Sequence, residues 1–531
     1  MPSNEFTMSA APEWLAHDPF GQPKPSDVSP GSTLLSGGKT PVILAAARNG
    51  YVSFRLLVRG AGEFSLRSRL SRGLQIDLFK AWYHCIPRQD GKPPVLLPDA
   101  LVPVRSRQAF QLPDPDNRIE GQTTQEFWVD VYVPHDAAPG RASGKIQLQS
   151  GTTTTELSLV IDVLEAVLPD KPAIQMDHNS YGCRWAPKEY PNSFSSIKNR
   201  DRFWGKAIDV LHNRYRIFHE HRALYHDLGY GHSGSADPIY RPDVVGSGRS
   251  RHLDNWDLFD RHYGPLLDGS AFSKAGPGSP PPRRIAAPIW GVYTPFNPEW
   301  PAAYLHWGEP GYEAEFTRCL GQFDAHLQEK KWTASRMEFF FNHKKRYRWF
   351  EWDGDEAKYA KDDSYILEMG RMWKSVATQS PVKWVYRMDA SWQMKNQWER
   401  LAGCANFWIS GGFVYWYRQE VERVIDRGDI VWTYGGTPAI TEPSSSILAN
   451  LHRVWTSGFS GFVSWNVEVS PDPWFASNGD SLAIIYPGER FGIPCPIPSA
   501  RLKIQRNAIQ DVDLIIQATP PDRLTARRNA V

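Results

Sequence analysis

Two different rhythms of apolar and polar positions divide the chain near residue 170. From Pro41 to about Val167, short segments alternate apolar and polar residues and are broken by Gly, Pro, Asp and Asn. Alternation with a period of two is typical of half-buried strands, and many short strands separated by turn residues predict a β-sandwich. The strands expected here are Tyr51–Arg59, Gln75–Tyr83, Glu126–Val133, Gly144–Gln149 and Thr155–Val163.

After the segment Leu168–Pro172, the pattern changes to strands that alternate with helices. Two prolines within five residues cannot continue a strand ladder, so this segment is expected to be a linker. Eight strand–helix units in one block predict a (β/α)8 barrel. The expected strands are Ile174–Asp177, Ile217–Ala223, Ile285–Val292, Arg336–Asn342, Lys383–Asp389, Ala405–Ser410, Ile430–Tyr434 and Gly461–Asn466. The expected helices include Arg200–His212, Tyr312–Lys330, Ser364–Ala377, Ser444–Thr456 and Ala500–Leu514.

The sequence therefore predicts a multidomain β plus α/β protein, and its 531 residues are enough for two domains. We expect an N-terminal extension at 1–40, a β-sandwich domain at 41–170 and a (β/α)8 TIM-like barrel at 171–531. Two Gly-, Ser- and Pro-rich insertions, Gly229–Ser250 and Gly269–Arg284, lie between the second and third expected strands. Because loops that follow barrel strands lie at the catalytic face, the first insertion is expected to cover the site.

Charge and composition narrow the function classes. The formal net charge is +2 and no long basic run is present, so a nucleic-acid partner is not expected. No stretch approaches 18 consecutive apolar residues, which predicts no membrane span. The segment Met1–Asp18 is acidic and lacks an apolar core, which indicates a cytoplasmic protein or an exported one whose signal is already removed. The net charge does not fix the oligomeric state, and a homo-oligomer is compatible with it.

Neither the cysteines nor the glycine motifs indicate a metal or a cofactor. The five cysteines are widely spaced and odd in number, a pattern typical of buried thiols. No Gly-x-Ser-x-Gly elbow, phosphate loop or dinucleotide fingerprint stands at a strand–helix junction. Hydrolases with a serine nucleophile, kinases and nicotinamide enzymes are therefore not expected, and we predict no cofactor.

Aromatic residues are unusually frequent, with 22 Trp, 21 Tyr and 25 Phe, and many occur in loop-like surroundings. An indole face matches the apolar face of a pyranose, so tryptophans in loops favour a sugar-binding surface. Core filling is the alternative, since aromatic side chains dominate core burial. In a barrel, functional residues concentrate at the carboxyl ends of the strands. The expected strand ends carry Asp177, His219, His221, Asn342, His343, Lys344, Asp389, Trp432, Tyr434, Trp465 and Asn466.

These carboxylates, histidines and aromatic rings predict a glycan site with an oligo- or polysaccharide as the substrate. Glycoside cleavage needs an acid for the leaving oxygen and a second group that stabilises the oxocarbenium-like state. Asp355 and Glu356, in the loop after the fourth expected strand, could supply both, because mutual repulsion would raise the pKa of one carboxyl. The alternative for this pair is a solvated surface position. Glu338 lies early in that strand and ranks below the pair.

The cluster His219-Glu220-His221 raises the question of a metal site. Its spacing is not the helical His-Glu-x-x-His of zinc peptidases, and no third ligand is evident, so no metal is expected. On a strand, alternation would put His219 and His221 on one face, where they could hydrogen-bond a substrate. A purely structural role is the other interpretation.

The last third of the chain resembles proteins related to glycoside hydrolase family 123. The pieces that carry the resemblance are Trp432–Gly435 with Pro438, Val454-Trp455, Gly458–Asn466, Asp472–Trp474, Gly479-Asp480, Tyr486–Gly488, Ser499–Leu502 and Arg506–Asp511. Trp128–Pro134 with Pro139-Gly140 is similar to the sandwich domain of that family.

The resemblance implies β-N-acetylgalactosaminidase-type, substrate-assisted, retaining catalysis. In that mechanism an Asp orients the 2-acetamido group of the substrate and the adjacent Glu acts as acid and base. Carried onto this sequence, the pair is Asp355 and Glu356, with Asn342-His343 as the alternative position at the strand end. Trp432, Tyr434, Trp465 and Trp474 would shape the sugar subsite. The alternatives are a glycosidase with separated carboxylates, such as Asp355 or Glu356 with Asp177 or Asp389, and a catalytically silent carbohydrate-binding protein.

Overall fold

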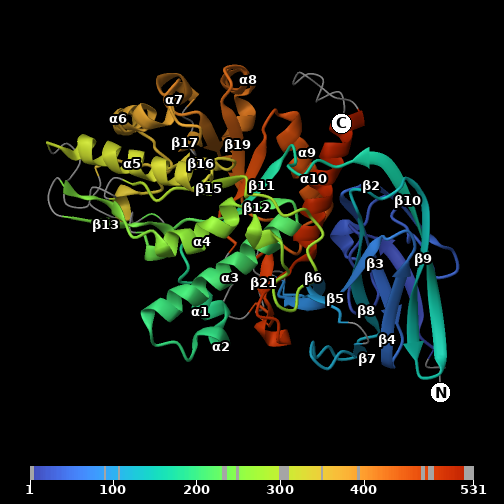
Figure 1. Cartoon of the computed structure of the whole chain (residues 1–531). Helices are drawn as coiled ribbons and strands as arrows, with labels where there is room; N and C mark the ends of the chain where they lie inside the picture. Colours follow the sequence, from blue (N-terminus) through green and yellow to red (C-terminus); the bar gives the residue numbers. More distant parts are fainter. Residues whose placement is uncertain are drawn as a thin grey trace.

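The chain folds into a β-sandwich beside an α/β barrel, with helix α10 between them (Figure 1). The computed structural model describes residues 5–88, 91–105, 108–229, 232, 236–246, 250–297, 300, 310–347, 351–390, 395–467, 473–475 and 483–518. The predicted fold class, a sandwich followed by a TIM-like barrel, is confirmed.

The sandwich consists of two five-stranded sheets. Their facing sides bury an apolar core that includes Phe54, Phe127, Ile146 and Leu157. The first sheet has the order β1 (Thr7–Pro12), β3 (Gly50–Arg59), β8 (Thr124–Val133), β5 (Gln75–Ile86) and β6 (Val95–Pro103). The second has the order β2 (Val42–Arg48), β10 (Thr153–Val167), β9 (Gly140–Ser150), β4 (Gly62–Leu70) and β7 (Ala109–Leu112).

The five strands expected from the alternating pattern all form, as β3, β5, β8, β9 and β10. The segment before residue 41 differs from the expected extension, because β1 pairs antiparallel with β3 and completes the edge of the first sheet. Its register runs from Thr7 opposite Arg59 to Pro12 opposite Phe54. The apolar residues Met8 and Ala10 on one face of β1 are buried, which explains why this segment joins the core.

The barrel consists of eight strands whose pairings in the sheet are all parallel. The two end strands of this sheet, β12 and β15, also contact each other, so the barrel is nearly closed. The order around it is β12 (Ala223–Asp227), β11 (Gln175–Ser180), β20 (Gly461–Ser464), β19 (Ile430–Gly435), β18 (Phe407–Ser410), β17 (Lys383–Ala390), β16 (Arg336–Phe339) and β15 (Gly291–Tyr293).

Helices cover the outside of the barrel strands (Figure 1). The longer ones are α3 (Arg200–Glu220), α4 (Asp257–Leu267), α5 (Tyr312–Glu329), α6 (Ala360–Ala377), α7 (Lys395–Arg400), α8 (Arg418–Asp426), α9 (Ser445–Thr456) and α10 (Ala500–Ala518). Shorter elements are α1 (Ala186–Glu189), α2 (Pro191–Phe194) and the two-stranded sheets β13 (Asp243–Val245) with β14 (His252–Asp254) and β21 (Ile485–Pro487) with β22 (Pro496–Pro498). Within the described part of the chain, no helix has the length and apolar character needed to cross a membrane.

The second barrel strand lies further along the chain than expected. The segment Ile217–Ala223 was predicted as a strand, but α3 continues to Glu220 and β12 begins at Ala223. The helix is capped by Asn199, whose side chain accepts a hydrogen bond from Arg202 N at 3.0 Å. Buried residues at Leu211, Tyr215 and Phe218 repeat every three to four positions, so packing on the barrel extends the helix through the predicted strand. The prediction of a strand at Ile217–Ala223 is therefore wrong.

Buried ion pairs join the two domains through α10. The carboxylate of Asp130 on β8 lies 2.8 Å from Arg506 and 2.5 Å from Lys503, and all three side chains are almost completely buried. Asp99 on β6 accepts hydrogen bonds from Arg501 at 2.7 Å and 3.0 Å. These residues belong to the face of α10 that contacts the sandwich, so the helix serves both domains and holds them in one arrangement.

Candidate active site

The loop after β16 returns to the barrel and brings Asp355 to its carboxyl end. The amides of Gly354 and Asp355 donate to the carbonyl of His343 at 3.1 Å and 3.2 Å, and Asp355 pairs with Asp389 through an isolated parallel bridge. A Cβ at residue 354 would lie 2.3 Å from the carbonyl oxygen of Phe341, so this close return requires glycine. Asp355 thereby extends the barrel wall beside the end of β17.

Glu356 has a left-handed backbone, with φ at +53°. Non-glycine residues adopt this region at a cost, and such positions concentrate at functional sites. The side chain of Glu356 is 30% exposed, whereas that of Asp355 is 10% exposed. The adjacent carboxylates therefore lie at different depths, with Asp355 in the wall and Glu356 nearer to solvent.

A histidine and a lysine hold the carboxylate of Asp355. Its Oδ2 lies 3.1 Å from Nε2 of His232 and 3.2 Å from Nζ of Lys344. Burial alone would raise the pKa of Asp355, but the hydrogen bond from His232 and the charge of Lys344 outweigh it and lower that pKa below its usual range. Asp355 is therefore ionised at neutral pH. His232 comes from the first Gly/Ser/Pro-rich insertion, the one expected to cover the site.

Lys344 also contacts Glu356, and so bridges the two carboxylates. Burial favours the neutral amine, but the charges of Asp355 and Glu356 raise the pKa of Lys344 above its usual value. The other oxygen of Glu356 accepts a hydrogen bond of 3.3 Å from the hydroxyl of Tyr434 at the end of β19. Four of the predicted site residues, Lys344, Asp355, Glu356 and Tyr434, are thus brought into one connected group.

Asp389, at the end of β17, lies beside this group. Its pKa is shifted upward, in the opposite direction to the pKa of Asp355. Arg387 donates to it in a bidentate pair, with distances of 2.8 Å and 3.0 Å. Burial is the main cause that raises the pKa of Asp389 to about 6; Arg387 opposes it, and the nearby carboxylates of Asp355 and Glu338 add to the upward shift. The site thus holds one carboxyl with a lowered pKa and one with a raised pKa, a difference typical of acid–base sites.

Asp177, on β11, belongs to a buried polar layer in the barrel. Its Oδ1 lies 2.6 Å from Nδ1 of His226 on β12, and its Oδ2 accepts a hydrogen bond of 3.3 Å from Tyr293 on β15. Nε2 of His226 lies 2.9 Å from the carbonyl oxygen of Gly291, so both ring nitrogens face acceptors. Burial alone would raise the pKa of Asp177. The combined effect of His226 and Arg387 is larger and opposite, so the pKa is below its usual value.

Sequence reasoning gave no role to Arg387, His226 or Tyr293, and it ranked Glu338 low. Glu338 is fully buried, with Arg336 at 2.7 Å and Arg387 at 3.5 Å from its two oxygens. The signal available in the sequence was the alternation along β17, where Arg387 and Asp389 are two residues apart and therefore share a face.

The structure separates two predicted aromatic residues, Trp432 and Trp474, from the connected group. Trp432 is fully buried two residues below Tyr434 on the same face of β19, with its indole donating to Ser460 and lying 5.0 Å from the guanidinium of Arg336. Trp474 packs edge-on against Trp82 of the sandwich, with ring centroids 5.5 Å apart. These two side chains fill the core, which is the alternative interpretation of the aromatic content. Trp465, after β20, is 42% exposed.

Asn342 and His343 lie beneath the site. Both side chains are buried, and the ring of His343 donates from Nε2 to the carbonyl of Trp352 at 3.1 Å. Burial lowers the pKa of His343 to about 3, so the imidazole is neutral. Asn466 follows Trp465 and is half-buried. The alternative catalytic position Asn342-His343 therefore presents a supporting pair, while the two carboxylates lie closer to solvent.

His219 and His221 lie at the opposite end of the barrel. Both stand at the carboxyl end of α3, just before β12 begins, and so at the amino ends of the strands. The ring of His219 stacks on Phe272, with centroids 4.1 Å apart. The strand that would have placed these histidines with Asp355 does not form, because α3 occupies that part of the chain.

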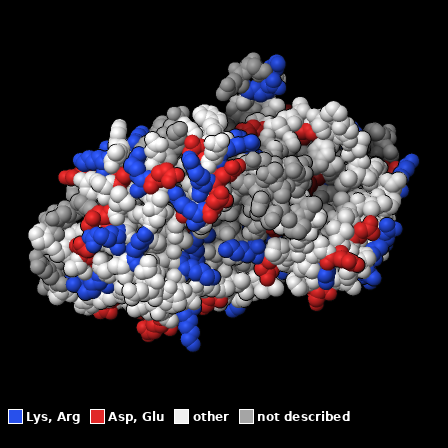
Figure 2. All heavy atoms as spheres, turned by 90° about the horizontal axis from the view of Figure 1, so that it is seen from above, with Lys and Arg blue, Asp and Glu red and all other residues white. Residues whose placement is uncertain are grey.

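The surface seen from above shows Lys and Arg side chains interspersed with Asp and Glu side chains over its described part (Figure 2). This agrees with a formal net charge of only +2. Long-range attraction of a strongly acidic polymer requires a surface dominated by one sign, so this face does not favour such a ligand.

Comparison with solved structures supports the fold. No protein-family model and no curated protein matches the chain. It is similar to a family 123 glycoside hydrolase from Clostridium perfringens, solved in a study of glycolipid glycan hydrolysis, with a TM-score of 0.64 and 13% identity over 97% of this chain and 89% of that one. The resemblance to family 123 is thus confirmed for the fold.

Two further solved structures align less closely. They are an endo-β-1,4-mannanase from Thermotoga petrophila, with a TM-score of 0.35 and 11% identity over 67% of this chain and 79% of that one, and a putative α-galactosidase from Bacteroides fragilis, with a TM-score of 0.27 and 12% identity over 84% and 78%. Similarity at this level carries no conclusion about this chain.

Proposed function

We propose that the protein is a retaining glycoside hydrolase that acts on a glycan containing an N-acetylhexosamine. The observation that supports this most is the pair Asp355 and Glu356 at the carboxyl end of the barrel, with Asp355 held ionised and Glu356 closer to solvent. This is the arrangement required when a fixed carboxylate orients the substrate and a neighbouring carboxyl exchanges protons with it. The fold shared with a family 123 glycoside hydrolase agrees with this assignment.

In the proposed first step, the carboxylate of Asp355 accepts a hydrogen bond from the N–H of the 2-acetamido group. The acetamido oxygen then attacks the anomeric carbon while the bond to the leaving oxygen breaks. Glu356 gives its proton to that oxygen, which leaves as an alcohol, and a cyclic oxazolinium ion remains. Water then attacks the anomeric carbon and Glu356 takes its proton, so the sugar is released with its anomeric configuration retained.

Lys344 and Tyr434 position Glu356 in this scheme. In the structure both contact its carboxylate. Glu356 must exchange the Lys344 contact for the leaving oxygen when the substrate binds, while Lys344 keeps its contact of 3.2 Å with Asp355. Trp465, whose indole is exposed at the end of β20, provides an apolar surface for the sugar ring.

A second mechanism is favoured by the raised pKa of Asp389. A carboxyl with a pKa of about 6 retains a proton in mildly acidic solution, as a general acid must. In this alternative, Asp389 protonates the leaving oxygen while Asp355 or Glu356 acts as nucleophile or base, and the substrate needs no acetamido group. The two schemes make different demands on the sugar, so substrate chemistry separates them.

The test is hydrolysis of paired aryl and alkyl glycosides by the wild type and by Glu356→Gln, Asp355→Asn and Asp389→Asn. Loss of the general acid should reduce the rate by on the order of 10²–10⁴ with a poor leaving group, and far less with a nitrophenolate that needs no proton. Glu356→Gln is expected to show this difference in rate loss between the two kinds of leaving group. Glu368→Gln, which alters an exposed ion pair with Arg371, is the matched control.

A thiazoline analogue of the cyclised acetamido group separates the two mechanisms. It should inhibit the wild type competitively if the acetamido oxygen is the nucleophile, and 2-hydroxy glycosides should then be poor substrates. The mechanism with Asp389 as the acid would be favoured by two results together. The wild type would hydrolyse 2-hydroxy and 2-acetamido glycosides at equal rates, and Asp389→Asn rather than Glu356→Gln would lose more rate with the poor leaving group. Sugar binding without turnover of any glycoside would instead identify a carbohydrate-binding protein.

A further inference from the structure

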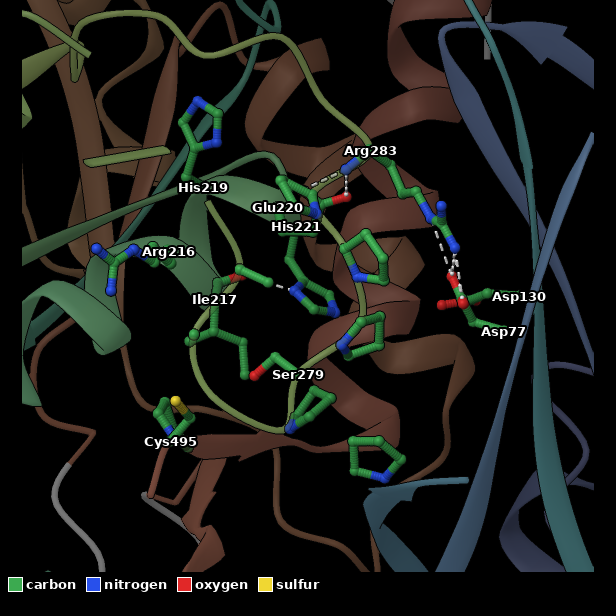
Figure 3. A pocket seen from close by; sticks show the side chains of 18 of the residues that line it. Asp77, Asp130, Arg216, Ile217, His219, Glu220, His221, Ser279, Arg283 and Cys495 are labelled. Atoms are coloured by element: carbon green, nitrogen blue, oxygen red, sulfur yellow. Dashed lines mark hydrogen bonds and ion pairs between the residues drawn. The ribbon is translucent and has the colours of Figure 1, made fainter. Parts of the chain in front are cut away.

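A cavity lies where the sandwich meets the barrel (Figure 3). Its barrel side is at the amino ends of the strands, the opposite end from Asp355 and Glu356. The end of α3 forms one wall, because the helix stops at Glu220 and the strand β12 starts at Ala223. The second Gly/Ser/Pro-rich insertion forms another wall, and β5, β8 and α10 close the remaining sides. This position gives the cavity no part in the proposed glycosidase site.

Apart from the exposed Lys274, the charged groups around the cavity have partners within the protein. Arg283 reaches across to Asp77 at 2.9 Å, and its amide donates to Glu220. Lys503 and Arg506 share the carboxylate of Asp130, as described above.

Two more polar side chains of the cavity wall are also satisfied. Tyr51 donates to Glu220. Arg216 donates to the carbonyl of Ala271 and to the side chain of Asn213, both at 2.7 Å. These internal contacts leave little demand for a charged ligand.

His221 is the exception. Its side chain is 5% exposed, and its Nδ1 lies 2.7 Å from the carbonyl oxygen of Ile217. A carbonyl oxygen only accepts, so Nδ1 carries the proton. Burial, together with the charges of Lys503 and Arg506, lowers the pKa of His221 well below its usual value, so the ring is neutral. Nε2 therefore has a free lone pair.

Nε2 of His221 has no protein partner. Among the described residues that line the cavity, it is the buried side-chain nitrogen or oxygen without a hydrogen bond from the protein. A buried acceptor left without a donor is unfavourable, and a ligand with an O–H or N–H group would satisfy it. Figure 3 shows the ring of His221 between Ile217 and the loop that carries Ser279 and Arg283.

Much of the remaining wall is apolar. The loop contributes three consecutive prolines, 280–282, which have no N–H group to donate. Phe79, Ile217 and Phe272 add aromatic and aliphatic surface. The centres of water-sized molecules could occupy about 80 Å³ of this space, several times the 10–15 Å³ or so that one water needs.

We propose that this cavity binds a small ring compound with an apolar body and one strong hydrogen-bond donor, with phenol as the simplest representative and His221 Nε2 as the acceptor. Sites for small molecules commonly combine apolar walls with one or a few placed polar groups. An uncharged ligand matches the internal pairing of most of the charged side chains, and one donor group matches the buried Nε2 of His221, which has no protein partner.

The test compares phenol with anisole, in which a methyl group replaces the donated hydrogen. Binding to the full-length protein is measured by calorimetry, and the ¹⁵N signal of His221 Nε2 is followed in histidine-labelled protein. We expect phenol to bind in the millimolar range or tighter, about tenfold more tightly than anisole, and to shift the Nε2 signal in the direction of hydrogen-bond acceptance.

The variant His221→Phe should reduce phenol affinity to that of anisole, whereas His252→Phe, at an exposed histidine in β14, should leave both affinities unchanged. Equal binding of phenol and anisole to the wild type would overturn the proposal. So would the absence of phenol binding, or a crystal structure in which water occupies the position next to Nε2 and phenol does not displace it. The wild-type comparison decides the matter even if His221→Phe does not fold.

Discussion

The ammonium group of Lys344 lies 3.2 Å from Oδ2 of Asp355 and also contacts Glu356, so one cation serves both carboxylates of the candidate site. These three residues come from a single loop that leaves β16 and returns beside β17. The contact links the protonation of Asp355 to the position of Glu356, and its removal should therefore alter both.

Replacement of Lys344 by Met is expected to move the acid limb of the pH–activity profile to higher pH. The positive charge of Lys344 lowers the pKa of Asp355, so its loss raises that pKa and protonates the orienting carboxylate earlier as the pH falls. We expect kcat/KM to drop roughly 10- to 100-fold on the acidic side and less at neutral pH. Lys344→Arg keeps the charge and should keep the limb in place. An unmoved limb in Lys344→Met would show that Asp355 does not titrate in the reaction.

Asp389 should make the protein relatively less stable as the pH rises. Its pKa is raised to about 6 in the folded state, above the usual value near 4, so the folded state binds the extra proton. The associated stability is fully present below pH 4 and is lost as the pH rises through 6. The unfolding free energy of the wild type relative to Asp389→Asn should therefore fall by on the order of 2–3 kcal/mol from pH 4 to pH 7. Urea denaturation at both pH values measures this difference, and a constant difference would contradict it.

The substitution Asp130→Asn should strongly destabilise the protein. It leaves the buried cations Lys503 and Arg506 without their carboxylate, a change that typically costs about 3–5 kcal/mol. The matched change Asp162→Asn removes a partner of Arg141 in a solvent-exposed pair and should have no measurable effect. Chemical denaturation followed by tryptophan fluorescence compares the two, and similar small losses in both would show that α10 is not held to the sandwich by this pair.

Removal of the exposed indole in Trp465→Ala should weaken substrate binding without loss of stability. The side chain is 42% exposed, so its truncation leaves little cavity in the core. Loss of a stacking surface should raise KM about tenfold and leave the melting temperature within about 1 °C of the wild type. Phe20→Ala, at a 40% exposed ring in the sandwich half of the chain, is the control. An unchanged KM in Trp465→Ala would remove Trp465 from the sugar subsite.

The period of apolar residues was enough to predict the sandwich, the barrel and most of their strands, because burial on one face or both faces of a strand is a local pattern. It failed at Ile217–Ala223, where β-branched and aromatic residues fit either element and packing against the barrel keeps α3 helical to Glu220. Likewise, the aromatic content indicated important rings but not their surroundings. Trp432 and Trp474 fill the core, while Trp465 remains exposed.

For the site, the sequence by itself determined that Asp355 and Glu356 are adjacent and follow a barrel strand. Only the tertiary structure decided their different environments, because His232, Tyr434 and Asp389 reach them from separate segments of the chain and Lys344 reaches them from the other end of their own loop. A pKa depends on burial and on charges a few ångströms away, and these distances do not exist until the barrel has closed. The same holds for the charge of Lys503 that acts on His221, because Lys503 comes from α10, whereas the contact of His221 with Ile217 is local to the end of α3.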